Sequence, residues 1–335
     1  AYNYFKKAEH VEAPGKDIAR LSLAAHFFSL GYALYELKNF KNSIIAYSIS
    51  LELNPDNANA YINRGIAYAK QQKYNEAIKD YNKAIELNPD LAEAYNNRGN
   101  AYAKLGEYNR AIEDYNKAVE LNPDLVGAYN NRGLAYAELG EYDRAIKDYN
   151  KAIELNPDLA EAYNNRGNAY LELHEYAKAI EDFNKAIELN KDYAEAYNNR
   201  GVAYAKQQKY DKAIEDFNKA IELNPDDAEA YGNRGIAYAK QQKYNEAIKD
   251  FNKVIESNPN DAKAYYNRGL TYAELGEYDR AKEDMLRAGN LFTNKRKIEY
   301  AIRVCEVIFN IGEESERVIA GYILLLHSYI SRSDS

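Results

Sequence analysis

The stretch IAYAKQQKYNEAIKD occupies residues 66–80 and occurs again, unchanged, at residues 236–250. The tripeptide Asn-Arg-Gly precedes both copies and recurs along the chain with its glycine every 34 residues. These glycines are Gly65, Gly99, Gly133, Gly167, Gly201, Gly235 and Gly269, and a degenerate copy upstream places Gly31 in the same frame. A fixed period of this length is the signature of a repeat architecture. We number each repeat from 1 to 34, so that these glycines stand at position 8.

Small and aromatic residues follow a helical period within each repeat. In the second repeat they are spaced by 4 and 3 residues, and then, after a gap, by 3, 4 and 3. The residues are Tyr61, Gly65 and Tyr68, followed by Tyr74, Ala77, Tyr81 and Ala84. Each set forms one stripe on an α-helix. Every repeat is therefore predicted to contain two helices.

The residues between the stripes predict where the helices end. Gln71-Gln72 or Leu105-Gly106 separates the two helices, and glycine there can take the left-handed conformation that ends a helix. An Asn-Pro-Asp sequence such as residues 88–90 closes most repeats. Proline stops the second helix, and we expect the aspartate to cap the next one.

At these positions the chain resembles the tetratricopeptide repeat, whose signature places aromatic residues, Gly, Ala and Pro at fixed offsets. The resemblance covers residues 24–291, or eight repeats. The departures from the pattern are Leu34 and Ser43 in the first repeat, Lys191 in place of proline, and Met285, Gly289 and Thr293 in the eighth. The resemblance implies an all-α, right-handed superhelical solenoid of antiparallel helix pairs. It also implies that the first helices of the pairs line a concave groove.

The ends of the chain break the period, and we expect three parts: an N-terminal segment or helical cap at 1–23, the eight repeats at 24–291, and C-terminal helices at 292–335. The last part is predicted to form two helices, at 295–311 and 315–331. They either cap the last repeat or, through 315–331, mediate self-association into a homo-oligomer.

Charge and composition narrow the classes of partner. The net charge of the 335-residue chain is -8, and residues 295–335 contribute none of it because their charges balance. An acidic repeat region repels phosphates, which argues against nucleic acid and against an anionic membrane surface. The single cysteine, Cys305, allows no intrachain disulfide, and no signal-peptide pattern opens the chain. The apolar stretch 318–330 is too short to span a bilayer. We expect a cytoplasmic protein.

Catalytic motifs are missing from the sequence. It contains no phosphate loop, dinucleotide fingerprint or nucleophile elbow. The histidines His10, His26, His174 and His327 are scattered without metal-ligand spacing. Cys305 lies on a predicted apolar face and is interpreted as a core residue. We predict no enzymatic activity, no catalytic residue, no cofactor and no metal site.

Two charged residues recur beside the packing stripes and predict an ion pair inside each repeat. Position 7 is Arg64, Arg98, Arg132, Arg166, Arg200, Arg234 and Arg268, and position 23 is Asp80, Asp114, Asp148, Asp182, Asp216, Asp250 and Asp284. The first repeat has Leu30 and Ala46 instead, so both charges vanish together. A buried charge needs a partner, and we expect each arginine to pair with the aspartate of its own repeat. The alternative is a row of arginines available to an acidic ligand.

Asparagines are predicted to line the groove. Position 6 lies roughly 200° around the helix from positions 4 and 8, away from the packing stripe. It is Asn63, Asn97, Asn131, Asn165, Asn199, Asn233 and Asn267, and position 5 is also asparagine at Asn96, Asn130, Asn164 and Asn198. Asparagine is a poor helix former, and its amide offers two donors and two acceptors. The row resembles the asparagine ladder of tetratricopeptide proteins that hold substrate polypeptides. The alternative is that near-identical repeats simply duplicated an Asn-Arg-Gly sequence.

Other positions on this face vary, which predicts a groove that is partly apolar with scattered carboxylates. Such a groove suits an extended protein or peptide segment with small apolar and some basic residues. The chaperone-adaptor branch of the family clamps a carboxylate with Lys at positions 2 and 5 and Arg at position 6. Only Lys263, at position 2, matches that clamp. The sequence therefore predicts a non-enzymatic protein-binding scaffold. The alternatives are a self-assembling structural element and the recruitment arm of a larger enzyme.

Overall fold

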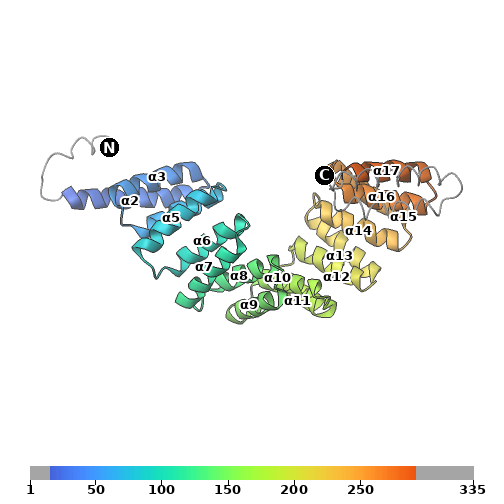
Figure 1. The fold of residues 1–335 in the computed structure, drawn as a ribbon, viewed down its shortest axis with the longest axis horizontal. Helices are drawn as coiled ribbons and strands as arrows, with labels where there is room; N and C mark the ends of the chain where they lie inside the picture. Colours follow the sequence, from blue (N-terminus) through green and yellow to red (C-terminus); the bar gives the residue numbers. More distant parts are fainter. Residues whose placement is uncertain (1–15, 292–335) are drawn as a thin grey trace, which may run out of the picture. The chain divides into compact units, whose positions relative to one another are not determined.

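A computed structural model describes residues 16–291, and within that range the chain forms sixteen α-helices and no strand (Figure 1). The chain divides into two compact blocks, residues 1–169 and residues 170–335. The division falls inside the helix α10 (Ala160–Glu172). The predicted helices at 295–311 and 315–331, together with Cys305, lie outside the described residues.

The first block consists of consecutive helix pairs, one for each repeat. We call the first helix of a pair the A helix and the second the B helix. The pairs are α2 (Lys16–Glu36) and α3 (Phe40–Leu53), α4 (Ala58–Lys70) and α5 (Tyr74–Leu87), α6 (Ala92–Lys104) and α7 (Tyr108–Leu121), and α8 (Val126–Glu138) and α9 (Tyr142–Leu155). The helix α2 begins at Lys16, so it extends beyond the predicted start of the repeats at residue 24.

The second block continues the same pattern. Its helices after α10 are α11 (Tyr176–Leu189), α12 (Ala194–Lys206), α13 (Tyr210–Leu223), α14 (Ala228–Lys240), α15 (Tyr244–Ser257), α16 (Ala262–Glu274) and α17 (Tyr278–Leu291). In both blocks an A helix packs against its own B helix, against the preceding B helix and against the next A helix. The A helices therefore form one continuous face in each block, which we call the A-helix face: α4, α6 and α8 in the first, and α12, α14 and α16 in the second.

Glycine at position 8 makes room for a buried aromatic ring at position 24. A Cβ atom on Gly133 would lie 2.6 Å from Cε1 of Tyr149, and the corresponding distance from Gly201 to Phe217 is also 2.6 Å. The ring of Tyr149 is fully buried. Alanines complete the core around each ring, as Ala145 and Ala152 do in this repeat. Each of the first seven repeats thus buries one large ring among small residues, and the eighth buries Met285 instead.

The turn inside each pair uses a left-handed residue at position 15. The predicted glycines take this role at Gly106, Gly140 and Gly276, with φ between 74° and 78°. Non-glycine residues adopt the same conformation in the other repeats: Lys38, Gln72, His174, Gln208 and Gln242. The turn geometry is therefore common to all eight repeats, although the residue that forms it is not.

The predicted aspartate cap is wrong, because the N-cap is the residue after the Asn-Pro-Asp sequence. Asp90 does not cap α6; its backbone N–H donates to Oδ1 of Asn88. Leu91 stands at the N-cap of α6, and its side chain makes no capping hydrogen bond. Where this next residue is polar it does cap, as Asp261 does by accepting from the amide of Ala264. Lys191 shows that proline is dispensable, since α11 still ends at Leu189.

Candidate peptide-binding surface

The predicted ion pairs form, and each is bidentate. Nε of Arg132 donates to Oδ2 of Asp148 at 2.7 Å, and its Nη2 donates to Oδ1 at 2.7 Å. The same geometry joins position 7 to position 23 in both blocks: Arg64 to Asp80, Arg98 to Asp114, Arg200 to Asp216, Arg234 to Asp250, and Arg268 to Asp284. The pairing within a repeat is confirmed.

A third contact, which we did not predict, is a hydrogen bond from each arginine to the preceding repeat. Nη1 of Arg132 donates to Oδ1 of Asn116 at 2.8 Å, and Asn116 stands at position 25 of the repeat before. Equivalent acceptors are Ser48, Asn82, Asn150, Asn184, Asn218 and Asn252. A polar residue recurs at position 25 in every one of these repeats, and that was the available signal. One guanidinium thus joins three helices.

These contacts engage three of the five N–H donors of each guanidinium and pair its charge with an aspartate of the same repeat. The Asp148 side chain is buried, and the hydrogen bonds to it raise the pKa of Arg132. Burial raises the pKa of Asp80, and the hydrogen bonds from Arg64 oppose that rise. The guanidinium of Arg132 also lies 5.5 Å from the ring centre of Tyr129. We interpret the pair as structural, because both side chains are largely buried and each neutralises the charge of the other.

The asparagines at positions 5 and 6 have different surroundings. All seven at position 6 are half-buried on the A helices. At position 5, Asn130, Asn164 and Asn198 are buried, and Asn96 is half-buried. Contact of the position-5 asparagines with a peptide stays a prediction. The hydrogen bonds that Asn130 and Asn198 make show that position 5 turns toward the next A helix.

The two positions are linked across repeats by hydrogen bonds. Nδ2 of a position-6 asparagine donates to Oδ1 of the position-5 asparagine one repeat earlier. The observed links are Asn131 to Asn96 at 3.2 Å, Asn165 to Asn130 at 3.1 Å and Asn233 to Asn198 at 3.1 Å. Position 5 in turn donates to a glutamate at position 2 of the next repeat, from Asn130 to Glu161 and from Asn198 to Glu229. We call this set of bonds the inter-repeat amide chain.

Three position-6 asparagines stand outside the inter-repeat amide chain. Asn97 and Asn267 make no side-chain hydrogen bond with any residue in 16–291, because position 5 of the preceding repeat is Ile62 in one case and Gly232 in the other. Asn63 is hydrogen-bonded to Tyr47 instead. The A-helix face therefore carries amides that join repeats and amides whose side chains make no hydrogen bond within residues 16–291.

Apolar side chains lie on the same face at position 9. Leu134 is 37% exposed and Ile236 is 41% exposed.

Within residues 16–291 no group of three or more His, Cys, Asp or Glu side chains is placed to hold a metal ion. In that range, too, no helix combines the length and the apolar character that crossing a bilayer requires.

Models of the tetratricopeptide repeat match most of the chain. One, described as a TPR repeat, matches five overlapping segments, and two described as a tetratricopeptide repeat match three more. The segments are 31–72, 67–106, 99–140, 133–174 and 167–208, then 194–227, 228–261 and 251–283. The chain belongs to the tetratricopeptide repeat family. The fold class predicted from the sequence, an all-α solenoid of antiparallel helix pairs, is confirmed by the helices and by this membership.

Solved structures of other tetratricopeptide proteins are similar. One is a tetratricopeptide repeat protein from Parabacteroides merdae, with 26% identity and a TM-score of 0.59, over 72% of this chain and 96% of that one. Another belongs to the Cut9–Hcn1 hetero-tetramer of the APC/C, with 19% identity and a TM-score of 0.63, over 90% of this chain and 58% of that one. PilF of Pseudomonas aeruginosa is 18% identical, with a TM-score of 0.56, over 63% of this chain and 96% of that one. The latter two show likeness of fold alone. No curated protein matches the chain.

Proposed function

We propose that this tetratricopeptide repeat protein is a non-enzymatic, cytoplasmic scaffold that binds extended polypeptide along the A-helix face of each block. A role in protein–protein interaction follows from the repeat family in general. The finer proposal rests on one observation: an asparagine stands at position 6 of seven successive A helices, half-buried in every case. Residues 1–23 and 292–335 are proposed to flank the repeats as caps.

The amides retain hydrogen-bonding capacity after the inter-repeat bonds are counted. Asn131, Asn165 and Asn233 each use one N–H, and their Oδ1 atoms accept no bond from a residue in 16–291. Asn97 and Asn267 use neither group. An amide offers two donors and two acceptors, so each can still bond a peptide N–H or C=O. Bonds to the peptide backbone need no particular partner sequence, which suits a repeated row.

Hydrogen bonds alone do not supply the affinity. Each contributes about 0.5–1.5 kcal/mol net, whereas association costs about 4–15 kcal/mol. Seven such bonds roughly break even. Apolar side chains of the partner must therefore find places on the same face, for which Leu134 and Ile236 are suited by their exposure.

A peptide array tests the proposal. The variant Asn97→Ala/Asn267→Ala removes the two unspent amides without cutting the inter-repeat amide chain. We expect it to bind array-selected peptides about tenfold or more weakly than the unaltered protein, as the loss of two hydrogen bonds implies. The control is Lys117→Ala/Lys219→Ala, which alters exposed ion pairs on the B helices α7 and α13. Equal binding by the asparagine variant and the unaltered protein would reject the role of position 6.

Self-association is the second candidate. Large apolar side chains are exposed on the first helix pair, including Ile18 and Leu37 at 76% each, and Ile45 at 50%. The predicted segment 315–331 is the other candidate contact. Light scattering of the full chain across a concentration series tests self-association, since a monomer at high concentration excludes the assembly.

A further inference from the structure

The inter-repeat amide chain is interrupted at the seventh repeat. Gly232 stands at position 5, where the four preceding repeats carry asparagine, and Lys263 stands at position 2 of the next repeat, where Glu161 and Glu229 accept bonds elsewhere. The donor and the acceptor are thus both replaced at the same junction. Asn267 is left unbonded as a consequence, because its usual acceptor at position 5 is missing.

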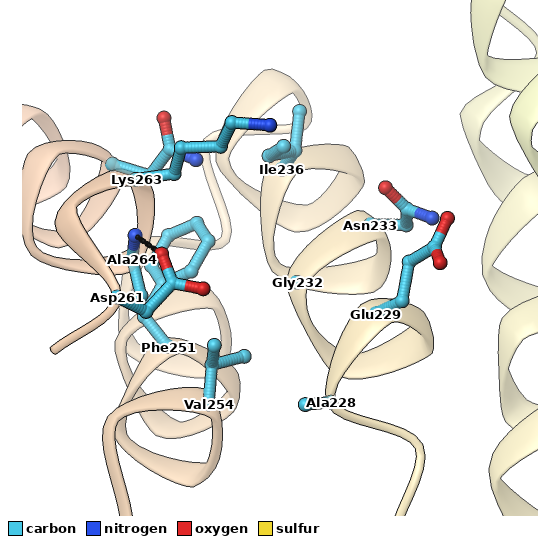
Figure 2. A pocket seen from close by; sticks show the side chains of 11 residues that line it. Ala228, Glu229, Gly232, Asn233, Ile236, Phe251, Val254, Asp261, Lys263 and Ala264 are labelled. Carbon is cyan, nitrogen blue, oxygen red and sulfur yellow. Dashed lines mark hydrogen bonds between the residues drawn. The ribbon is translucent and has the colours of Figure 1, made fainter. Parts of the chain in front are cut away.

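Gly232 lines a pocket between α14 and α16 that has a volume of about 480 Å³. Figure 2 shows the ring of Phe251 and the side chain of Val254 on its inner wall, with Ile236 at the rim. A Cβ atom on Gly232 would meet only Val254 Cγ2, at 3.8 Å, which is ordinary contact. A side chain at this position would therefore fit without a clash, and the pocket volume lies within the range of ligand-binding pockets.

The charged groups around the pocket are not equally engaged. Asp261 caps α16 by accepting from the amide of Ala264 at 2.9 Å, and Glu229 accepts from Nδ2 of Asn198 at 3.5 Å. Lys263 is exposed and forms no ion pair with any residue in 16–291. Figure 2 shows Lys263 on the opposite side of the pocket from Glu229 and Asn233. Lys263 therefore supplies the positive charge on its side of the pocket, and the carboxylate of Glu229 supplies a negative charge on the opposite side.

We infer that this pocket binds a bulky apolar side chain of the extended polypeptide, and that Lys263 selects an acidic residue next to it. The inference rests on the proposed function and adds a specificity site to it. Asn233 and Asn267, which also line the pocket, are placed to bond the peptide backbone on either side of that side chain. Ile236, which is 41% exposed, supplies apolar surface at the rim, and the lysine pairs with a carboxylate there.

The variant Gly232→Asn places in the pocket the side chain that the four preceding repeats carry at position 5. It is the sharpest test. The ligands are synthetic peptides in which one position is Ala, Leu or Phe and the next is Asp, Asn or Lys. We expect the unaltered protein to prefer Leu or Phe followed by Asp, and Gly232→Asn to bind such peptides about tenfold more weakly while it still binds the Ala series unchanged. The matched control is Gly127→Asn, because nothing lies within 4 Å of a Cβ there and no pocket is filled.

The variant Lys263→Glu tests the charge separately. It installs the glutamate that other repeats carry, and we expect it to reverse the preference at the second peptide position from Asp to Lys without loss of the preference for Leu or Phe. Thermal unfolding of both variants checks their fold, and we expect neither to melt below the unaltered protein.

The possible outcomes separate the two proposals. If the unaltered protein binds peptides but shows no preference for an apolar residue, or if Gly232→Asn keeps that preference, the pocket assignment is wrong and the binding function stands. If the unaltered protein binds no peptide of the array, both proposals fail. A preference for Leu or Phe that is lost in Gly232→Asn and kept in Gly127→Asn supports the pocket.

Discussion

At the scale of single residues, the contact between position 8 and position 24 sets how closely the two helices of a repeat approach. Gly133→Ala would place a Cβ 2.6 Å from the buried ring of Tyr149. Because a packed core cannot absorb such an overlap, we expect a loss of about 1–3 kcal/mol in the free energy of unfolding. The matched variant is Gly127→Ala, which meets nothing within 4 Å in the same helix, α8, and should gain about 0.5–1 kcal/mol. Urea unfolding measures both, and two equal effects would show that the ring contact does not matter.

The surroundings of the candidate asparagines could be predicted from the sequence only in part. The period identified the asparagines of positions 5 and 6, but not which of the two reaches the surface. Asn130 and Asn131 are adjacent, with identical side chains, and only the packing of the next A helix makes one buried and the other half-buried. Burial at a junction between repeats depends on how the repeats stack. The rotation of about 100° per residue within one helix does not predict how neighbouring repeats stack.

At the scale of helices, the arginine at position 7 joins two B helices to one A helix, and the first repeat suggests how to test it. That repeat carries Leu30 and Ala46 in place of the charged pair. We expect Arg132→Leu or Asp148→Ala alone to cost about 3–5 kcal/mol of unfolding free energy, because each leaves a buried charge unpaired. The double variant should cost less than the sum of the two, with a coupling of about 1–3 kcal/mol. Chemical unfolding of all four proteins gives the coupling, and additive costs would mean that the bidentate bond contributes nothing.

The ion pair itself was predicted, whereas its third contact was not. Arg64 stands sixteen residues before Asp80 and sixteen after Ser48, so spacing alone does not distinguish its own B helix from the preceding one. The joint loss of both charges in the first repeat pointed to the aspartate. Position 25 carries a contrast that we did not use: it is polar in the seven repeats that precede such an arginine, and it is Leu286 in the eighth, where Ile302 stands one period after Arg268. The helix caps were mispredicted because Asp90 lies one residue before the N-cap.

At the scale of the whole molecule, the two blocks bury different rings at position 24. The first block has Tyr47, Tyr81, Tyr115 and Tyr149, and the second has Phe183, Phe217 and Phe251. Burial raises the pKa of Tyr47 to about 12 and raises those of the other three tyrosines further. A raised pKa stabilises the fold fully below the ordinary tyrosine value of about 10, and this contribution is lost as the pH rises through the folded-state pKa.

The first block should therefore unfold at a lower alkaline pH than the second. Each buried tyrosine is expected to reduce the free energy of unfolding by about 1 kcal/mol at pH 11 relative to pH 9. The measurement is a circular-dichroism titration from about pH 8 to about pH 12, a range that brackets the ordinary tyrosine pKa. It compares the unaltered chain with Tyr81→Phe/Tyr115→Phe/Tyr149→Phe. The variant should keep its helix content to higher pH. Identical titrations would show that other groups govern the alkaline transition.

The central claim is that a bound polypeptide contacts the position-6 amides, and the asparagine side-chain resonances in an NMR titration with an array-selected peptide test it most directly. The position-25 amides, such as that of Asn116, bond to arginines and serve as controls in the same spectrum. We predict that the side-chain NH₂ signals of Asn97, Asn131, Asn233 and Asn267 shift on addition of the peptide, while those of position 25 do not. Shifts confined to position 25, or to neither position while the peptide binds, would contradict the account.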